Sequence, residues 1–288
     1  MAATQKILVT GSNGQLGSEL QELAPAHSSF EFVFLTRAEM PLNDNAVIRE
    51  TILAHQPAFV INCAAYTAVD KAESEPEEAF QINSLAVEAM AKACAEIGAK
   101  FIHVSTDYVF DGTRKELLKE DDAVAPINVY GESKLAGEQK ALAAAPDAVI
   151  VRTSWVYSYY GKNFVKTMMR LMAEKDSINV VNDQSGSPTY AADLAKAILQ
   201  IISSPQWHPG IFHFSNEGVI TWFDFAKEIG AQLQTACDVQ PTTTDNFPTP
   251  AKRPAYSAMD KSKIQQLYGV ELKTWKESLQ QCLAKLKA

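Results

Sequence analysis

The sequence is poor in cysteine, has no long apolar run and carries no excess of positive charge. The four cysteines lie far apart and form no paired motif, so we expect reduced thiols and neither disulfide bonds nor a zinc site. They are Cys63, Cys94, Cys237 and Cys282. None of the five histidines pairs with another at a metal-ligand spacing, and no metal site is predicted.

No apolar run is long enough to cross a membrane, and residues 1–6 lead directly into the first predicted strand. We therefore expect a cytoplasmic protein without a signal peptide or a membrane partner. Its formal net charge is -8, from 26 basic and 34 acidic side chains. This balance argues against nucleic acid and anionic lipid as partners, but it is compatible with a local basic pocket for a phosphate.

The chain has 288 residues with 47% hydrophobic side chains, which is enough to bury a core in one or two packed domains. Its first half alternates apolar runs with helical patterns, and this predicts an α/β fold with a doubly wound parallel (Rossmann) sheet. The pattern Ser74-Glu75-Pro76-Glu77 predicts a capping box at the start of one helix. The predicted strands cover 7–9, 30–35, 59–62, 101–104 and 148–151, and the predicted helices cover 45–55, 76–97 and 130–145.

The second half is less regular. We expect helices at 164–173, 193–203, 261–268 and 275–287, a strand at 211–214 and a Pro/Thr-rich connection at 241–254. The predicted domains are a dinucleotide-binding domain over 1–153, with 190–204 packing back on it, and a smaller mixed α/β substrate lobe over 154–288.

A glycine motif follows the first predicted strand and opens a helix, the context that a dinucleotide fingerprint requires. Gly11 would allow the tight turn, Gly14 would let the backbone approach a pyrophosphate, and Gly17 would let helix and strand pack closely. The alternative is an ordinary strand-to-helix turn. The candidate cofactor-binding residues of this segment are Gly11, Ser12, Asn13, Gly14, Gln15, Leu16 and Gly17.

Arg37 stands 20 residues after Gly17, just beyond the second predicted strand. A carboxylate at this point would bind the ribose 2′-hydroxyl of NAD, whereas a guanidinium suits the 2′-phosphate of NADP. We therefore favour NADPH, with NADH as a second cofactor that the site could accept. The alternative is a solvated arginine at the end of a strand.

Tyr130 and Lys134 are four residues apart and share one face of a predicted helix. A phenol has a pKa near 10, and an ammonium beside it would lower that pKa and make the tyrosine an efficient general acid. Thr106 closes the fourth strand at the edge where ligands bind in such sheets, so its hydroxyl could contact the same substrate carbonyl. The alternatives are a surface Tyr/Lys pair and a turn hydroxyl.

With glycine loop, strand-end hydroxyl and Tyr-x-x-x-Lys in this order, the chain resembles the extended short-chain dehydrogenase/reductase superfamily over essentially its full length. Within it, the chain most resembles the dTDP-4-dehydrorhamnose reductases. The matching segments are GSNGQLG at 11–17, NCAAYTAVD at 62–70, VSTDYVFDG at 104–112, YGESKLAGE at 130–138, RTSWVY at 152–157 and DQSGSPT at 183–189.

The resemblance implies reduction of the C4 keto group of dTDP-4-dehydro-6-deoxy-L-mannose to dTDP-L-rhamnose. Tyr130 would protonate the C4 oxygen, Lys134 would lower the Tyr130 pKa and bind the nicotinamide ribose, and Thr106 would orient the carbonyl. The further residues implied at the cofactor are Asn43, Cys63, Ala64, Ala65 and Tyr66, and those implied at the substrate are Thr106, Asp107, Trp155, Asn163 and Gln184. For Trp155, a place in the core is an equal alternative.

Other members of the superfamily give the competing functions. Dehydratases have glutamate where this chain has Tyr108, which argues against elimination of water. Three alternative functions stay open: an epimerase, a reductase of another nucleotide sugar, and a non-catalytic NADP-binding subunit like that of methionine adenosyltransferase. Glu19 matches a position at which some relatives bind Mg²⁺ in a homodimer; the alternative is a solvated first-turn glutamate. Arg253 could meet a diphosphate or lie on the surface.

Overall fold

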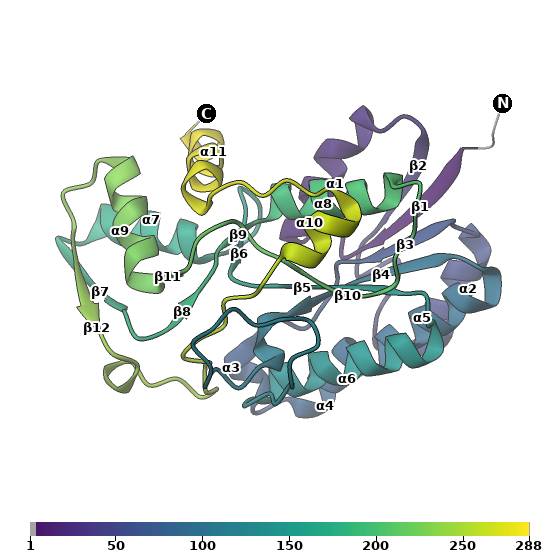
Figure 1. Ribbon diagram of the computed structural model, residues 1–288, viewed down its shortest axis with the longest axis horizontal. Coiled ribbons are helices and arrows are strands. Elements are labelled where there is room, and N and C mark those ends of the chain that lie inside the picture. The colour runs from purple at the N-terminus through teal and green to yellow at the C-terminus, as the bar shows by residue number, and fades with distance from the viewer. Residues whose placement is uncertain (1–3, 288) are drawn as a thin grey trace.

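The computed structural model describes residues 4–287, which form two lobes lying side by side (Figure 1). The larger lobe contains one six-stranded sheet of order β10-β5-β4-β3-β1-β2, in which every pairing is parallel. The predicted doubly wound parallel sheet is therefore confirmed. Its strands are β1 (Gln5–Thr10), β2 (Phe30–Leu35), β3 (Phe59–Asn62), β4 (Lys100–Thr106), β5 (Val149–Thr153) and β10 (Gly210–Phe214).

Helices cover both faces of this sheet (Figure 1). Because β3 is buried along its whole length, its side chains need apolar cover on both sides. Leu20 and Ile198 provide that cover on one face, and Ile48 and Met90 on the other. The helices of the first face are α1 (Gln15–Leu23), α8 (Ala191–Ser203) and α10 (Ser262–Tyr268), and those of the second are α2 (Asn45–His55), α5 (Ala86–Ile97) and α6 (Val129–Ala144).

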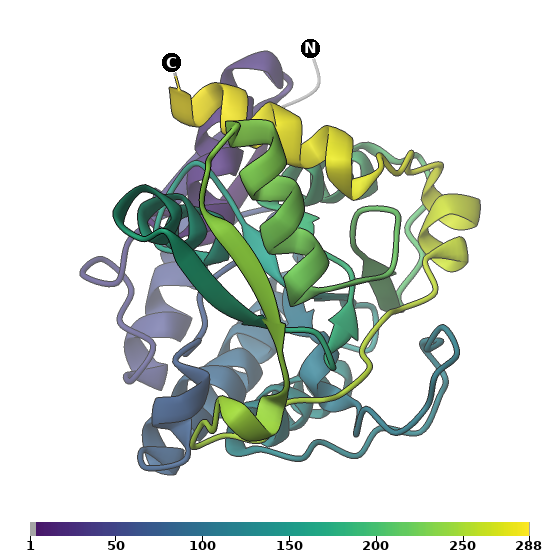
Figure 2. The same cartoon turned by 90° about the vertical axis from the view of Figure 1, so that its left-hand side faces the viewer.

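The smaller lobe has its own core, in which Phe225, Ile229 and Leu279 are fully buried. Figure 2 looks at this lobe from its end and shows helix α9 beside the parallel pair of β7 and β12. Its helices are α7 (Phe164–Glu174), α9 (Trp222–Leu233) and α11 (Trp275–Lys287). Its strand pairs are β7 (Ser177–Val181) with β12 (Asp238–Thr242), β6 (Val156–Tyr157) with β9 (Thr189–Tyr190), and β8 (Ser185–Gly186) with β11 (Ile220–Thr221).

The predicted helix over 76–97 is present, but one π-helical turn interrupts it. It consists of α4 (Pro76–Phe80), the π turn η2 (Gln81–Leu85) and α5, and a short helix α3 (Val69–Ala72) precedes it. Within η2, the Asn83 amide donates to the Ser133 hydroxyl of α6 at 3.0 Å and to the carbonyl of Tyr66 at 3.0 Å. The π turn thereby ties α6 to the segment that follows β3.

The capping box predicted from Ser74 is wrong. The Ser74 hydroxyl donates backward to the carbonyl of Lys71 at 3.0 Å, so it is not available to the first turn of α4. Glu75 takes the N-cap position without a side-chain cap bond, and its carboxylate pairs with Lys71 at 2.7 Å. Pro76 at the first helical position, which needs no hydrogen bond for its nitrogen, starts the helix instead.

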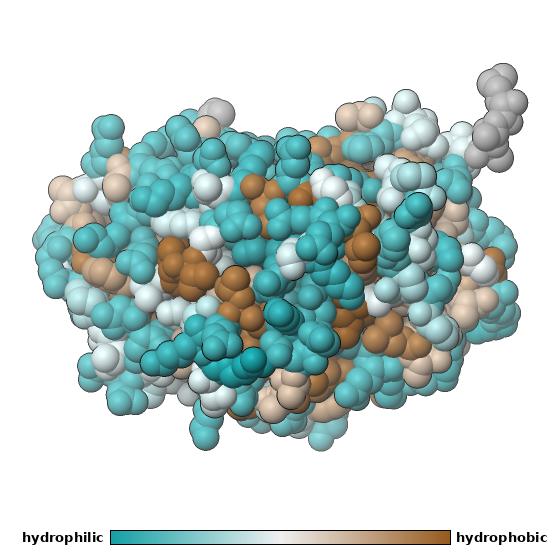
Figure 3. Space-filling view, in the orientation of Figure 1, coloured by the Kyte–Doolittle hydropathy of each residue, from teal (hydrophilic) through white to brown (hydrophobic). Residues whose placement is uncertain are grey.

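No helix within 4–287 is long and apolar enough to span a membrane. The face seen in Figure 3 is mainly hydrophilic, with apolar side chains in small groups, as is usual for folded proteins. All four cysteines are free thiols, as predicted.

Candidate active site

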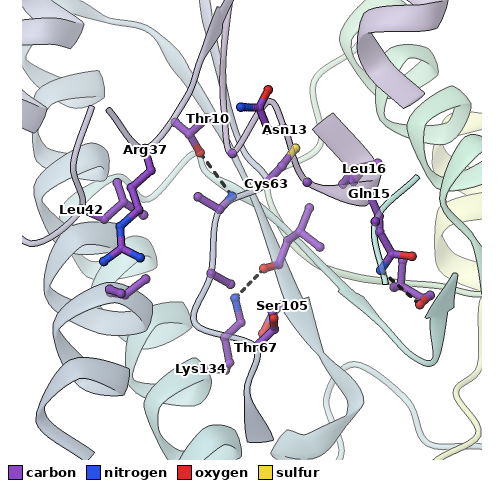
Figure 4. A pocket seen from close by; sticks show the side chains of 18 of the residues that line it. Thr10, Asn13, Gln15, Leu16, Arg37, Leu42, Cys63, Thr67, Ser105 and Lys134 are labelled. Atoms are coloured by element: carbon purple, nitrogen blue, oxygen red, sulfur yellow. Dashed lines mark hydrogen bonds between the residues drawn. The ribbon is translucent and has the colours of Figure 1, made fainter. Parts of the chain in front are cut away.

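A cavity of about 550 Å³ opens at the carboxyl ends of β1, β3 and β4, the edge at which parallel sheets bind ligands (Figure 4). Most of the predicted cofactor-binding residues line it. They are Gly11, Asn13, Gly14, Gln15, Leu16, Arg37, Asn43, Cys63, Ala64, Ala65, Tyr130 and Lys134.

The glycine turn fits tightly between α1 and the segment after β3. Gly11 has φ +63°, and an added Cβ there would lie 2.8 Å from the backbone of Ala64. A Cβ on Gly17 would lie 2.4 Å from the carbonyl oxygen of Gly11, so Gly17 serves packing and does not line the cavity. Gly14 is the N-cap of α1, which leaves the first amides of the helix at the cavity. This combination suits the pyrophosphate of a dinucleotide.

Arg37 lies at one end of the cavity, beside Leu42 (Figure 4). Its side chain is 82% exposed, and its nearest carboxylate is that of Glu78, 3.7 Å from Nη2. An exposed ion pair at this distance holds the guanidinium weakly. Arg37 is therefore available to a phosphate at this end of the cavity.

Tyr130 and Lys134 both face the cavity from α6. The N-cap residue of this helix is Asn128, whose side chain accepts from the Gly131 amide at 2.8 Å. The Lys134 Nζ atom donates to the carbonyl of Val104 at 2.7 Å and lies 3.2 Å from Nε2 of His103. Burial lowers the pKa of Lys134 to about 8.

The effect of Lys134 on the pKa of Tyr130 stays a prediction. Burial raises the pKa of Tyr130 to about 12, and the neighbouring Thr106 hydroxyl opposes this only in part. At neutral pH Tyr130 is thus a protonated phenol, the state from which a general acid acts.

Thr106 and Asp107 lie next to Tyr130 but do not line the cavity. The Thr106 hydroxyl accepts from the Tyr108 amide at 3.2 Å and donates to Oδ1 of Asp107 at 3.1 Å. The second carboxylate oxygen of Asp107 has no hydrogen-bond partner within 4–287, and burial raises the pKa of Asp107 to about 6. The ring of Tyr108 meets that of Tyr130 edge to face, with centroids 5.5 Å apart.

Three predicted substrate residues lie outside the cavity and make internal contacts in or beside the smaller lobe. Trp155, with φ 49°, stacks on Trp222 at 3.6 Å between ring centroids. The Asn163 amide donates to the Gln15 side chain at 3.0 Å and caps α7. The Gln184 amide donates to the Thr244 hydroxyl at 3.0 Å. A role for these side chains at the substrate stays a prediction.

Two further predicted cofactor residues do not line the cavity. Ser12 is buried beneath the glycine turn, where its carbonyl accepts from the Gln21 amide at 2.7 Å. The Tyr66 side chain turns away and donates to Glu75 at 2.7 Å, and Thr67 lines the cavity instead. Sequence reasoning also missed Thr10, Thr36, Met40, Leu42, Ile82, Val104, Ser105, Thr153, Val156, Gly161, Lys162 and Leu194.

Glu19 is not a solvated first-turn glutamate, because it is only 2% exposed. Ser158 donates to its Oε1 at 2.6 Å, and the Lys285 ammonium lies 3.7 Å from its Oε2 and also pairs with Glu22. These carboxylates are neutralised from within the chain. Residues 4–287 contain no group of three or more His, Cys, Asp or Glu side chains that could hold a metal ion.

Arg253 is not a surface arginine either. Its guanidinium is largely buried and pairs with both oxygens of Asp70, at 3.0 and 2.8 Å. It ties the connection after β12 to helix α3.

Comparison with known proteins agrees with this geometry. The profile of the RmlD substrate binding domain matches residues 5–288. The dTDP-4-dehydrorhamnose reductase of Aggregatibacter actinomycetemcomitans is 40% identical over 284 residues, covering 95% of this chain and 97% of the relative. The solved structure of the dTDP-4-dehydrorhamnose reductase of Clostridium acetobutylicum is 39% identical with a TM-score of 0.95, covering 99% of this chain and 100% of that one. That of Bacillus anthracis, solved in complex with NADP, is 39% identical with a TM-score of 0.93, covering 98% and 99%. With its glycine turn, its Tyr130 and Lys134 pair and this full-length similarity, the chain belongs to the RmlD substrate binding domain family.

Proposed function

We propose that this protein is an NADPH-dependent reductase of dTDP-4-dehydrorhamnose, converting the C4 keto group of the sugar to the hydroxyl of dTDP-L-rhamnose. The observation that carries the proposal is one cavity lined by the glycine turn, by Arg37 and by the Tyr130 and Lys134 pair. The relatives that bear this activity in their names match the chain over nearly its full length.

Tyr130 is the proton donor. Its phenol faces the cavity and stays protonated at neutral pH, so it delivers a proton to the C4 oxygen as that oxygen gains negative charge. Thr106, beside Tyr130, orients the same oxygen. Lys134 holds the dinucleotide ribose from one turn further along α6. When bound, the reduced nicotinamide supplies the hydride.

The residues at the carboxyl edge of β1 and β3 would hold the cofactor. The backbone at Gly11 and Gly14 receives the pyrophosphate, and the helix start at α1 favours its negative charge. Arg37 receives the 2′-phosphate through charge-assisted hydrogen bonds, which is why we propose NADPH as the preferred cofactor. NADH is the second choice, because position 37 carries an arginine and not the acidic side chain that would bind the ribose 2′-hydroxyl.

The sugar nucleotide would lie between the sheet edge and the smaller lobe. Asp107 is buried beside Tyr130 with one carboxylate oxygen that lacks a hydrogen-bond partner within 4–287, and its role at the substrate remains part of the proposal. We also propose the division into a domain over 1–153 and an interleaved substrate lobe over 154–288, from which α8, β10 and α10 pack back on the first domain. We further propose that the protein is cytoplasmic. We also propose that it forms a homodimer, which analytical ultracentrifugation would detect.

The direct test adds dTDP-4-dehydro-6-deoxy-L-mannose and NADPH to the purified protein, follows NADPH absorbance, and identifies the product by chromatography. We expect oxidation of NADPH with formation of dTDP-L-rhamnose. Tight NADPH binding with no turnover would contradict the proposal. Co-purification of a methionine adenosyltransferase under those conditions would instead support a regulatory subunit.

A further inference from the structure

A row of buried polar side chains crosses the sheet from the glycine turn to Lys134. Thr10 and Asn62 end β1 and β3, His103 lies in the middle of β4, and the strand register places the three side by side. The Thr10 hydroxyl donates to Oδ1 of Asn62 at 2.6 Å. The Asn62 amide lies 2.9 Å from Nδ1 of His103, whose Nε2 lies 3.2 Å from the Nζ of Lys134. Thr10 and Lys134 line the cofactor cavity, so this row joins two of its walls.

The orientation of the Asn62 amide is fixed by its neighbours. Its oxygen accepts from the Thr10 hydroxyl and from the backbone amide of Ala64, the latter at 3.2 Å. A backbone N–H can only donate, so a flipped amide would set two donors against each other at Ala64. The Asn62 NH₂ group therefore faces His103, and Nδ1 of His103 must accept.

An accepting Nδ1 fixes the proton of His103 on the other nitrogen. The ring is fully buried, and this burial keeps the pKa of His103 well below its usual value. A neutral imidazole that accepts at Nδ1 carries its hydrogen on Nε2. That N–H points to the Nζ of Lys134, and an ammonium has no lone pair with which to accept it.

We propose that His103 is a positioning residue for Lys134: its Nε2–H faces the ε-amine and favours the uncharged amine over the ammonium in the free protein. The amine then donates one N–H to the carbonyl of Val104 and has one more N–H for the cavity. Asn62 acts through His103 by setting which ring nitrogen carries the hydrogen. The role of the amine in reduction rests on the proposed function, but the hydrogen-bond pattern does not.

The charged groups nearest Lys134 lie on α6 and β5. Glu138, one turn along α6, raises the pKa of Lys134, but its carboxylate is held by Arg152 of β5 at 2.7 Å. Burial outweighs this effect, so the pKa of Lys134 still falls to about 8. The other titratable groups nearby are His103 and, through Tyr130, the carboxyl of Asp107.

Nuclear magnetic resonance of the full-length protein labelled with ¹⁵N-histidine tests the assignment, because the chain has only five histidines. We expect His103 to show a protonated Nε2 and an unprotonated Nδ1 at neutral pH. His213 is the matched control: it is equally buried, but its Nδ1 lies 3.1 Å from the carbonyl of Asp260, so its hydrogen belongs on Nδ1. A His103 ring with its hydrogen on Nδ1, or a doubly protonated ring, would overturn the proposal.

The variant Asn62→Leu tests the link to Lys134 without adding charge. With Nδ1 released, the hydrogen of His103 should move to Nδ1, and Nε2 should accept from an ammonium. The pKa of Lys134, followed by the ¹³Cε signal and assigned with Lys134→Arg, should then rise by about one unit, a tenfold gain in proton affinity. An unchanged or lower pKa would contradict the proposal. Should this variant fail to fold, the wild-type tautomer decides alone, and neither readout depends on turnover.

Discussion

Removing Glu138 should destabilise the protein far more than removing a glutamate from an equivalent pair on the surface. Glu138 and Arg152 are each 2% exposed, and the guanidinium binds both carboxylate oxygens, at 2.9 and 2.7 Å. Arg152 also lies over the Phe110 ring, 5.2 Å from its centroid, and its Nη1 has no other partner within 4–287. Glu138→Ala would therefore leave a buried positive charge with no counter-ion.

The magnitude follows from burial. Breaking a buried ion pair by removing one partner costs about 3–5 kcal/mol, whereas an exposed pair contributes about 0–1 kcal/mol. Arg49 and Glu96 form the matched control, with the same bidentate geometry at 2.9 and 2.6 Å but with side chains 54% and 44% exposed. Glu96→Ala should cost less than about 1 kcal/mol.

Urea unfolding followed by tryptophan fluorescence measures both free energies of unfolding under the same conditions. We expect Glu138→Ala to lose at least about 3 kcal/mol more than Glu96→Ala. Similar losses for the two variants would refute the reasoning, because burial would then not govern the cost. Since Glu138 lies on the helix that carries Tyr130 and Lys134, the variant should also lose turnover where it remains folded.

Three further predictions concern the site. Tyr130→Phe should lower kcat by about 10²–10⁴-fold with little change in NADPH affinity, and near-normal turnover would exclude Tyr130 as the proton donor. Arg37→Asp should weaken NADPH binding by roughly 10- to 100-fold and leave NADH binding nearly unchanged in fluorescence titration, since the lost charge-assisted bonds contribute about 1.5–3 kcal/mol; an unchanged ratio would mean that Arg37 does not contact the phosphate. Burial raises the pKa of Asp107 to about 6, so its contribution to stability is largest below its unfolded value of 3.8 and is lost as pH rises through 6. Asp107→Asn should therefore gain up to about 3 kcal/mol over wild type between pH 4 and pH 7 in urea unfolding, and a constant difference between the two proteins would contradict the raised pKa.

The sequence predicted the core of the larger lobe well because its signals are local. The bounds of β2, β3 and α2 are those predicted from the sequence. In the structure Asp44 caps α2, and its side chain accepts from the Ala46 and Val47 amides. The glycine turn was equally legible, since its spacing reflects close backbone contacts that no other residue permits.

The features that the sequence did not predict depend on contacts that a local pattern does not reveal. Gly161 and Lys162 line the cavity from a loop of the smaller lobe, and no local pattern marks them. The Ser74 cap failed because the same hydroxyl had a competing acceptor behind it. Lys134 contacts His103, and only the packing of α6 against β4 brings these two residues together. The sequence shows Lys134 four residues from Tyr130 but does not show the burial that raises the Tyr130 pKa.

The most direct test of the proposed reductase uses NADPH that carries deuterium on the transferred position of the nicotinamide. The purified protein is incubated with this cofactor and dTDP-4-dehydro-6-deoxy-L-mannose, and the product is examined by mass spectrometry and proton resonance. The proposed function predicts dTDP-L-rhamnose with one deuterium on C4 of the sugar. A product without deuterium at C4, or no product despite bound cofactor, would contradict it.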